Sequence, residues 1–134
     1  MGETLIIFSS SFAAIGHFIA AYSGVYWNPN FYWVDMVLHF MGGVFVASFA
    51  WWLGKKFSRL DVFHGDLLKN LIVFLSITAL VGVFWEFAEF GYDYYFVDSK
   101  TFSKLNFYQL SKSDTMSDLF FDLLGAFVVV IILR

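Results

Sequence analysis

Acidic and histidine residues recur in pairs inside the apolar stretches of this chain of 134 residues. The members of each pair are three or four positions apart, so a helix would place them on one face. Carboxylate oxygens with imidazole nitrogen, and without sulfur, are typical ligands of Mg, Mn, Fe or Zn rather than of copper. The pattern predicts a divalent metal ion, of unspecified identity, as the cofactor of a site formed by Asp35, His39, Glu86, Glu89, Asp118 and Asp122.

Basic residues are missing from the same stretches. No Lys or Arg precedes Lys55, and none lies between Lys69 and Lys100. A charge near the centre of a membrane helix costs about 2.5 to 3.5 kcal/mol, so several acids together require compensation. Protonation of the carboxyls, a lysine from the third loop, or a bound cation could provide it. The spacing resembles helical-bundle metal sites, although the Glu-x-x-His motif of those sites is absent.

Some of these polar residues also fit ordinary structural roles. Asp35 and Asp114 stand where helices are expected to begin, and Asp is common at N-caps and in first turns. For both, capping is at least as good an interpretation as function. His17 fits a core histidine bonded to a neighbouring Ser or carbonyl, and Asp93 continues the face of Glu86. The roles of His17, Asp93 and Asp114 stay open.

The composition places these residues in a membrane protein. The chain is 60% hydrophobic and 14% charged, against about 25% charged residues in soluble domains. A soluble fold of this length buries too little area to hide so much apolar surface. A net charge of −3 excludes a basic nucleic-acid-binding surface. The absence of cysteine excludes disulfides, thiolate nucleophiles and Cys-ligated metal sites.

Four apolar runs, each of about the 20 residues that cross a bilayer, predict the fold. Inside lipid only helices satisfy the backbone of an open chain. The first run lacks a positive start and a clean cleavage site, so we expect a retained helix rather than a signal peptide. The sequence predicts an all-α integral membrane bundle, a single transmembrane domain over residues 1–134, with helices at about 4–25, 34–54, 68–92 and 115–133.

The loops predict the orientation. Five basic residues flank the side of the termini and three occur in the third loop, about residues 93–114, so both termini are expected in the cytoplasm. The acids of the predicted site would then lie near the outer face, because the helices alternate in direction. The third loop would be a lid over them or an interfacial helix.

Three ordered motifs resemble a known family. They are the runs 35–43 (DMVLHFMGG), 85–90 (WEFAEF) and 113–126 (SDTMSDLFFDLLGA). They resemble the YjdF-like family of small bacterial inner-membrane proteins and, more weakly, the VanZ-like family associated with glycopeptide antibiotic resistance. The likeness covers residues 34–130, and the first helix matches neither family. It implies the same fold and the same polar residues, and it implies no reaction.

Three functions remain open for this multi-pass protein of the cell membrane. The first is metal-dependent hydrolysis or transfer on a lipid or lipid-linked substrate. The second is ion- or proton-coupled transport, against which no comparable polar trail continues into the inner half of the spans. The third is a structural or assembly subunit without catalysis. Membrane lipid and possibly a second copy of the chain are the expected partners, and nucleic acid is not.

Overall fold

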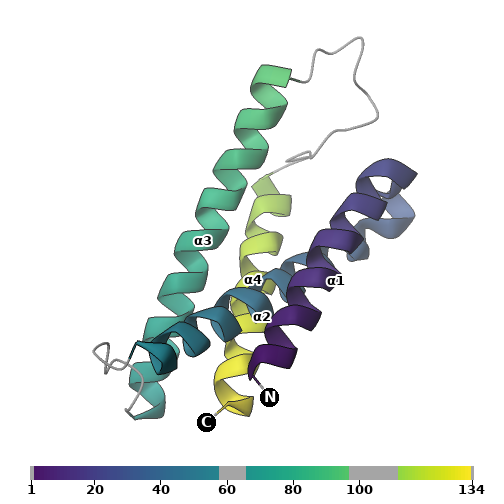
Figure 1. Ribbon diagram of the computed structural model, residues 1–134. Helices are drawn as coiled ribbons and strands as arrows, with labels where there is room; N and C mark the ends of the chain where they lie inside the picture. Colours follow the sequence, from purple (N-terminus) through teal and green to yellow (C-terminus); the bar gives the residue numbers. More distant parts are fainter. Residues whose placement is uncertain (1, 58–65, 97–111, 134) are drawn as a thin grey trace.

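The computed structural model describes residues 2–57, 66–96 and 112–133, and every long element in them is an α-helix (Figure 1). Each of the four long helices is long and apolar enough to cross a membrane. The prediction of an all-α, multi-pass membrane bundle is therefore confirmed. The helices are α1 (Gly2–Ser23), α2 (Tyr32–Lys56), α3 (Leu67–Phe96) and α4 (Lys112–Ile132), with short 3-10 helices η1 (Val25–Trp27) and η2 (Pro29–Phe31) between α1 and α2.

The observed helix ends differ most from the expected ones around the third loop. α3 continues to Phe96, past the expected end at 92, and α4 begins at Lys112, before the expected start at 115. The segment between them is therefore shorter than the sequence predicted. Residues 97–111 lie outside the described part of the chain, and so does the predicted lid.

A tight connection joins α1 to α2. Gly24 adopts the left-handed conformation with φ of 76°, which glycine reaches without steric cost and which ends α1. The side chain of Asn28 then accepts a hydrogen bond from the backbone N–H of Asn30 at 3.1 Å, at the start of η2. This connection turns η1 back beside the end of α1.

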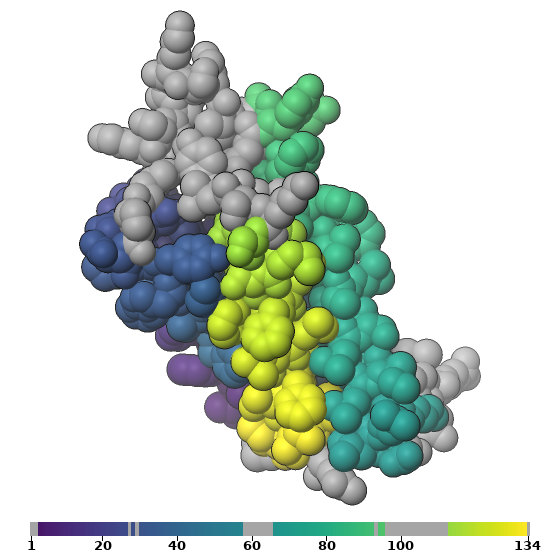
Figure 2. Space-filling view, turned by 180° about the vertical axis from the view of Figure 1, so that it is seen from behind, coloured from purple at the N-terminus to yellow at the C-terminus, as the bar shows by residue number. Residues whose placement is uncertain are grey.

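The four helices alternate in direction, and both termini lie at one end of the bundle (Figure 1). We call this the terminal end, and we call the opposite end, where α1 and α3 finish and α2 and α4 begin, the site end. α2 packs against each of the other three helices, and α4 packs against α2 and α3. Figure 2 shows α4 running between α3 and the beginning of α2. Among the described residues, α1 comes within 8 Å of α2, Cα to Cα, but of no other long helix.

Two glycines set how closely α2 and α4 approach each other. A Cβ atom on Gly43 would collide with the backbone carbonyl of Asp122, and one on Gly125 would collide with the backbone carbonyl of Phe40. Small residues are what allow membrane helices to pack so tightly. Close packing of α2 against α4 is therefore the role of these two glycines.

The apolar core lies on the terminal-end side of these glycines. It joins residues of α2, α3 and α4, and Phe74 of α3 is its largest fully buried member. The ring of Phe74 lies 5.8 Å from that of Trp51, centroid to centroid. The core residues are Val44, Ala47, Ala50, Phe74, Ala126, Val129 and Val130.

Candidate metal centre at the site end

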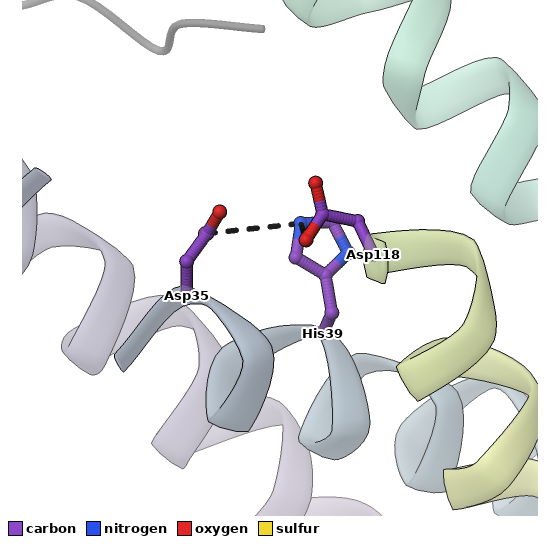
Figure 3. Close-up of side chains that lie close together, drawn as sticks. All are labelled: Asp35, His39 and Asp118. Atoms are coloured by element: carbon purple, nitrogen blue, oxygen red, sulfur yellow. Dashed lines mark ion pairs between the residues drawn. The ribbon is translucent and has the colours of Figure 1, made fainter. Parts of the chain in front are cut away.

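His39 lies at the centre of the polar residues, about two turns into α2 (Figure 3). Its Nε2 atom is 3.8 Å from Asp35 Oδ1 on the same helix and 3.9 Å from Asp118 Oδ1 on α4. Its Nδ1 atom is 3.5 Å from Asp122 Oδ2, also on α4. The imidazole is 8% exposed, so three carboxylates surround a buried ring.

The third helix adds two more carboxylates. Glu86 and Glu89 of α3 each present an oxygen that lies within 4.8 Å of a ligand atom of His39 and of each other. Asp35, His39 and Asp118 form a second group of the same kind. The indole N–H of Trp85 donates to Glu89 Oε1 at 2.8 Å and orients that carboxylate. His39 is therefore shared by two possible sets of metal ligands.

One buried carboxylate oxygen of the cluster, on Asp118, lacks a hydrogen bond among the described residues. Its side chain is 4% exposed, and its Oδ1 atom has no hydrogen-bond partner among the described residues. Buried carboxylate oxygens are normally hydrogen-bonded, paired or bound to a metal. Asp118 belongs to the group formed with Asp35 and His39.

Asp122 reaches the cluster through a slot between two helices. A Cβ atom on Gly82 of α3 would lie 2.8 Å from Asp122 Oδ2, and one on Gly42 of α2 would lie 3.5 Å from Oδ1. Larger residues would therefore displace this carboxylate, at Gly82 above all. The two glycines let a side chain of α4 pass between α2 and α3.

The six residues predicted from the sequence all gather around His39. Asp35 faces His39 within the first turn of α2, so it takes part in the cluster as well as favouring the start of the helix. Asp114 is buried in the first turn of α4 but belongs to neither ligand group. The side chain of Asp93 lies outside the described residues. Metal binding itself stays a prediction.

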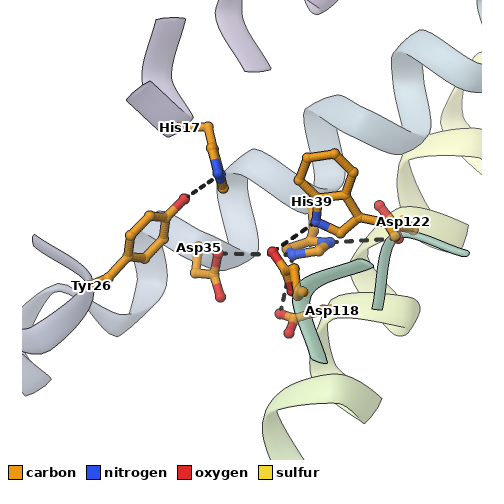
Figure 4. A network of polar contacts seen from close by, with 8 residues as sticks. His17, Tyr26, Asp35, His39, Asp118 and Asp122 are labelled. Atoms are coloured by element: carbon orange, nitrogen blue, oxygen red, sulfur yellow. Dashed lines mark hydrogen bonds and ion pairs between the residues drawn. The ribbon is translucent and has the colours of Figure 1, made fainter. Parts of the chain in front are cut away.

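A second polar pair adjoins the cluster at the end of α1 (Figure 4). Tyr26 lies 2.6 Å from His17, hydroxyl oxygen to Nδ1, and the ring of Trp85 meets His17 edge-on with centroids 5.6 Å apart. Burial, with the nearby charge of Asp35, raises the pKa of Tyr26. The hydroxyl thus stays protonated, and it donates to Nδ1 in the tautomer of His17 that carries its proton on Nε2. The bonded core histidine expected at position 17 is present, but its partner is a tyrosine.

The charges within the cluster do not balance among the described residues. A protonated His39 would offset one of five carboxylates, and Lys55, Lys56 and Lys69 lie at the terminal end. Lys112 is the first residue of α4 at the site end, but its side chain lies outside the described residues, as do Lys100 and Lys104. Several negative charges remain for a cation or for protons to neutralise.

Three buried polar atoms were missed by the sequence reading. Ser48 Oγ, Asn70 Oδ1 and Thr78 Oγ1 have no hydrogen-bond partner among the described residues, and all three side chains are buried. They lie closer to the terminal end than His39 and Glu86. Isolated Ser and Thr in apolar runs usually bond their own helix, so the residue types did not indicate that Ser48 and Thr78 would lack such a bond.

The family described as "Predicted membrane protein (DUF2238)" matches residues 2–134. The chain belongs to this family. Its description agrees with the four spans and assigns no reaction. A relative of this DUF2238 protein is an "Uncharacterized protein" of Thermotoga maritima, 32% identical over 127 residues that make up 93% of this chain. The chain spans 58% of that relative's length. No solved structure matches the chain.

Proposed function

We propose that the protein binds a divalent cation at the site end and uses it for hydrolysis or transfer on a lipid or lipid-linked substrate. The observation that carries the proposal is the buried His39, which shares carboxylate neighbours from α2, α3 and α4 in two ligand groups. Hard oxygen ligands with one imidazole suit Mg, Mn, Fe or Zn. Asp118 Oδ1, which has no hydrogen-bond partner among the described residues, supports a ligand in this position.

A cation held here would supply two kinds of chemistry. It would polarise a phosphoryl or carbonyl oxygen, and it would lower the pKa of a bound water so that the water becomes a nucleophile near neutral pH. Because the ligands on α2 and α4 lie within about the first three turns of these helices, the reacting group would lie in the half of the bilayer at the site end. Lipid headgroups are the substrates found at that depth. The resemblance to the YjdF-like family is compatible with the family match and adds no chemistry.

The test is cation binding by protein purified in mild detergent without chelator. We expect a transition metal in elemental analysis, or Mn²⁺ binding by electron paramagnetic resonance, close to one per chain. Asp118→Asn should abolish it with the fold retained in circular dichroism. Asp114→Asn is the matched control, because Asp114 is equally buried one turn earlier on α4 but outside both ligand groups, and it should bind normally.

Two results would overturn the proposal. One is a folded wild-type protein that binds no divalent cation at any concentration tested. The other is equal loss of binding in Asp114→Asn and Asp118→Asn, since a general loss of negative charge would then explain both. A structural or assembly role predicts the first result together with a co-purifying partner that Asp118→Asn releases.

A second candidate, proton- or ion-coupled transport, is favoured by the buried polar atoms toward the terminal end. Thr78 lies about 12 Å along α3 from Glu86, and Asn70 lies about 12 Å further, at 1.5 Å per residue. Such steps need bridging water, so the path is weaker evidence than the cluster. In liposomes, transport predicts cation-dependent flux that Thr78→Val lowers, whereas the cation-site enzyme predicts no flux.

A further inference from the structure

A cavity of about 560 Å³ lies beside the metal-ligand cluster, between α1 and α3. Its volume falls within the range of about 300 to 1,000 Å³ that is usual for ligand pockets. No pair of Cα atoms from α1 and α3 lies within 8 Å in the described part of the chain, and α2 forms the floor. The contact between His17 and Trp85 joins the two walls at the site end.

The lining of this cavity changes from polar to apolar along its length. Asp35, His39 and Asp122 belong both to the cluster and to the cavity wall, and His17 faces them from α1. Toward the terminal end the wall is formed by Ala13, Ala14, Phe45, Val46 and Val81, with the hydroxyls of Ser10 and Thr78. The cavity therefore fits an amphiphile, with its polar group at the cluster and its hydrocarbon between α1 and α3.

The length of the cavity suits a long, narrow ligand. The lining of α2 runs from Asp35 to Val46, about 16 Å at 1.5 Å per residue. A hydrocarbon chain is narrower than a helix, and it is present throughout the surrounding bilayer.

The charge of the cluster selects the polar group. Without a cation, the carboxylates would repel an anionic headgroup. With a divalent cation at His39, a phosphate would complete the coordination, as substrate phosphates do at Mg²⁺ sites that use only one or two carboxylates. A single ligand with a phosphate group and a hydrocarbon chain would thus occupy both the proposed cation site and the cavity.

We infer that the cavity binds a phosphate monoester or diphosphate of a single long hydrocarbon chain, which enters sideways from the bilayer between α1 and α3. This inference rests on the proposed cation site, because the phosphate is held through the cation. The chain lies along Ala14, Val46 and Val81, and the phosphate lies beside Asp35, His39 and Asp122. His17, hydrogen-bonded to Tyr26, lines the same polar end of the cavity.

The experiment uses a long-chain alkyl phosphate with a diazirine near the end of its chain, added to the full-length protein in liposomes. After illumination, mass spectrometry locates the labelled residues. We expect Mn²⁺-dependent labelling of Val46 and Val81, several-fold above that of Phe84, which lies 63% exposed on the outer surface of α3. Unlabelled alkyl phosphate should compete, and an alkyl trimethylammonium of equal length should not.

Two neighbouring residues of α1 provide the matched variants. Ala14→Phe fills the cavity wall and should lower the labelling several-fold. Ile15→Phe, at a position 60% exposed on the outside of α1, should leave it unchanged. Even labelling of both surfaces, or stronger competition by the trimethylammonium amphiphile, would overturn the inference. So would a dimer that Ala14→Phe dissociates, because a second copy would then fill the cavity.

Mn²⁺ binding measured in the same samples keeps the two proposals distinguishable. If the protein binds Mn²⁺ but the cavity is not labelled, the lipid inference fails and the cation site stands. If the cavity is labelled equally with Mn²⁺ and with chelator, the phosphate is not held through a cation, and the inference fails in that form. If neither Mn²⁺ binding nor labelling occurs, both proposals fail.

Discussion

The contact between α2 and α4 has two ends of opposite chemistry. Toward the terminal end, Val44, Ala47 and Ala126 pack with Phe74 into an apolar core. Toward the site end, His39 meets the carboxylates of Asp118 and Asp122 instead. Gly43 and Gly125 stand between the two, where the backbones come closest. One pair of helices therefore serves two different interfaces.

The difference shows how a small membrane protein divides stability from chemistry. Lipid tails are as apolar as Val or Phe, so the core gains its stability from close packing and not from removal of water. The site end gains nothing from packing like charges. It needs a cation or protons to hold its helices together, which leaves it able to respond to a ligand. The core, by contrast, should be indifferent to cations.

The largest change should come from the position that both ends share. Gly43→Val places branched carbons against the backbone of Asp122. We expect the free energy of unfolding to fall by about 3 kcal/mol, the upper end of the range typical of overpacking. Both the stability in detergent and the cation affinity should fall, measured by denaturant unfolding and Mn²⁺ titration.

Gly91→Ala is the control for that change, because nothing lies within 4 Å of a Cβ atom at Gly91 in α3. It should keep or slightly raise stability, since Ala favours a helix by about 1 kcal/mol over Gly. Normal Mn²⁺ binding by Gly43→Val would show that the close approach does not position the cluster.

A divalent cation should stabilise the site end specifically. At a free concentration 100 times its Kd, a ligand that binds only the folded state adds about 2.7 kcal/mol to the free energy of unfolding. Wild-type protein should show this gain with Mn²⁺ in a denaturant titration, and Asp118→Asn should show none. An equal gain in both proteins would place the bound cations elsewhere.

The membrane spans and the level of the polar residues could be predicted from the sequence, but the packing between the helices could not. Four spans follow from apolar run length, and the level of Asp35, Glu86 and Asp118 follows from alternating helix direction. Helical periodicity also gave the shared faces. The rotation of each helix and the distance between α1 and α3 depend on packing, which no single span encodes. The cavity between α1 and α3 could therefore not be predicted from the sequence.

The contacts made by the predicted residues could not be predicted from the sequence either. The contact of Gly43 with the backbone of Asp122 depends on the relative height of two helices. The hydrogen bond from Tyr26 to His17 depends on the turn at Gly24, and that from Trp85 to Glu89 depends on rotamers. Sequence gives residue types and faces, and three-dimensional packing selects the pairs.

A change confined to the core should weaken the bundle and spare the site. Phe74→Ala in a soluble core would cost about 3 to 5 kcal/mol, but lipid makes the transfer part of this cost small, so we expect about 2 kcal/mol. Mn²⁺ affinity and the stabilisation by Mn²⁺ should stay at wild-type values. Phe84→Ala, on the exposed surface of the same helix, should change neither. A lower Mn²⁺ affinity in Phe74→Ala would mean that the two ends are coupled through α3.

The smallest effect should come from the N–H group that orients Glu89. Trp85→Phe keeps an aromatic ring beside His17 but removes the donor that lies 2.8 Å from Glu89 Oε1. Loss of a partner that orients a metal ligand typically lowers affinity 10- to 100-fold, and since Trp85 is 47% exposed we expect about tenfold, at the lower limit. Trp52→Phe is the matched change at the terminal end, where the indole N–H donates to Glu3 Oε1 at 3.3 Å. Both variants lose an indole N–H group. A lower Mn²⁺ affinity in Trp85→Phe than in Trp52→Phe would therefore assign the effect to the site end. Equal Mn²⁺ affinities would show that Glu89 is not a metal ligand.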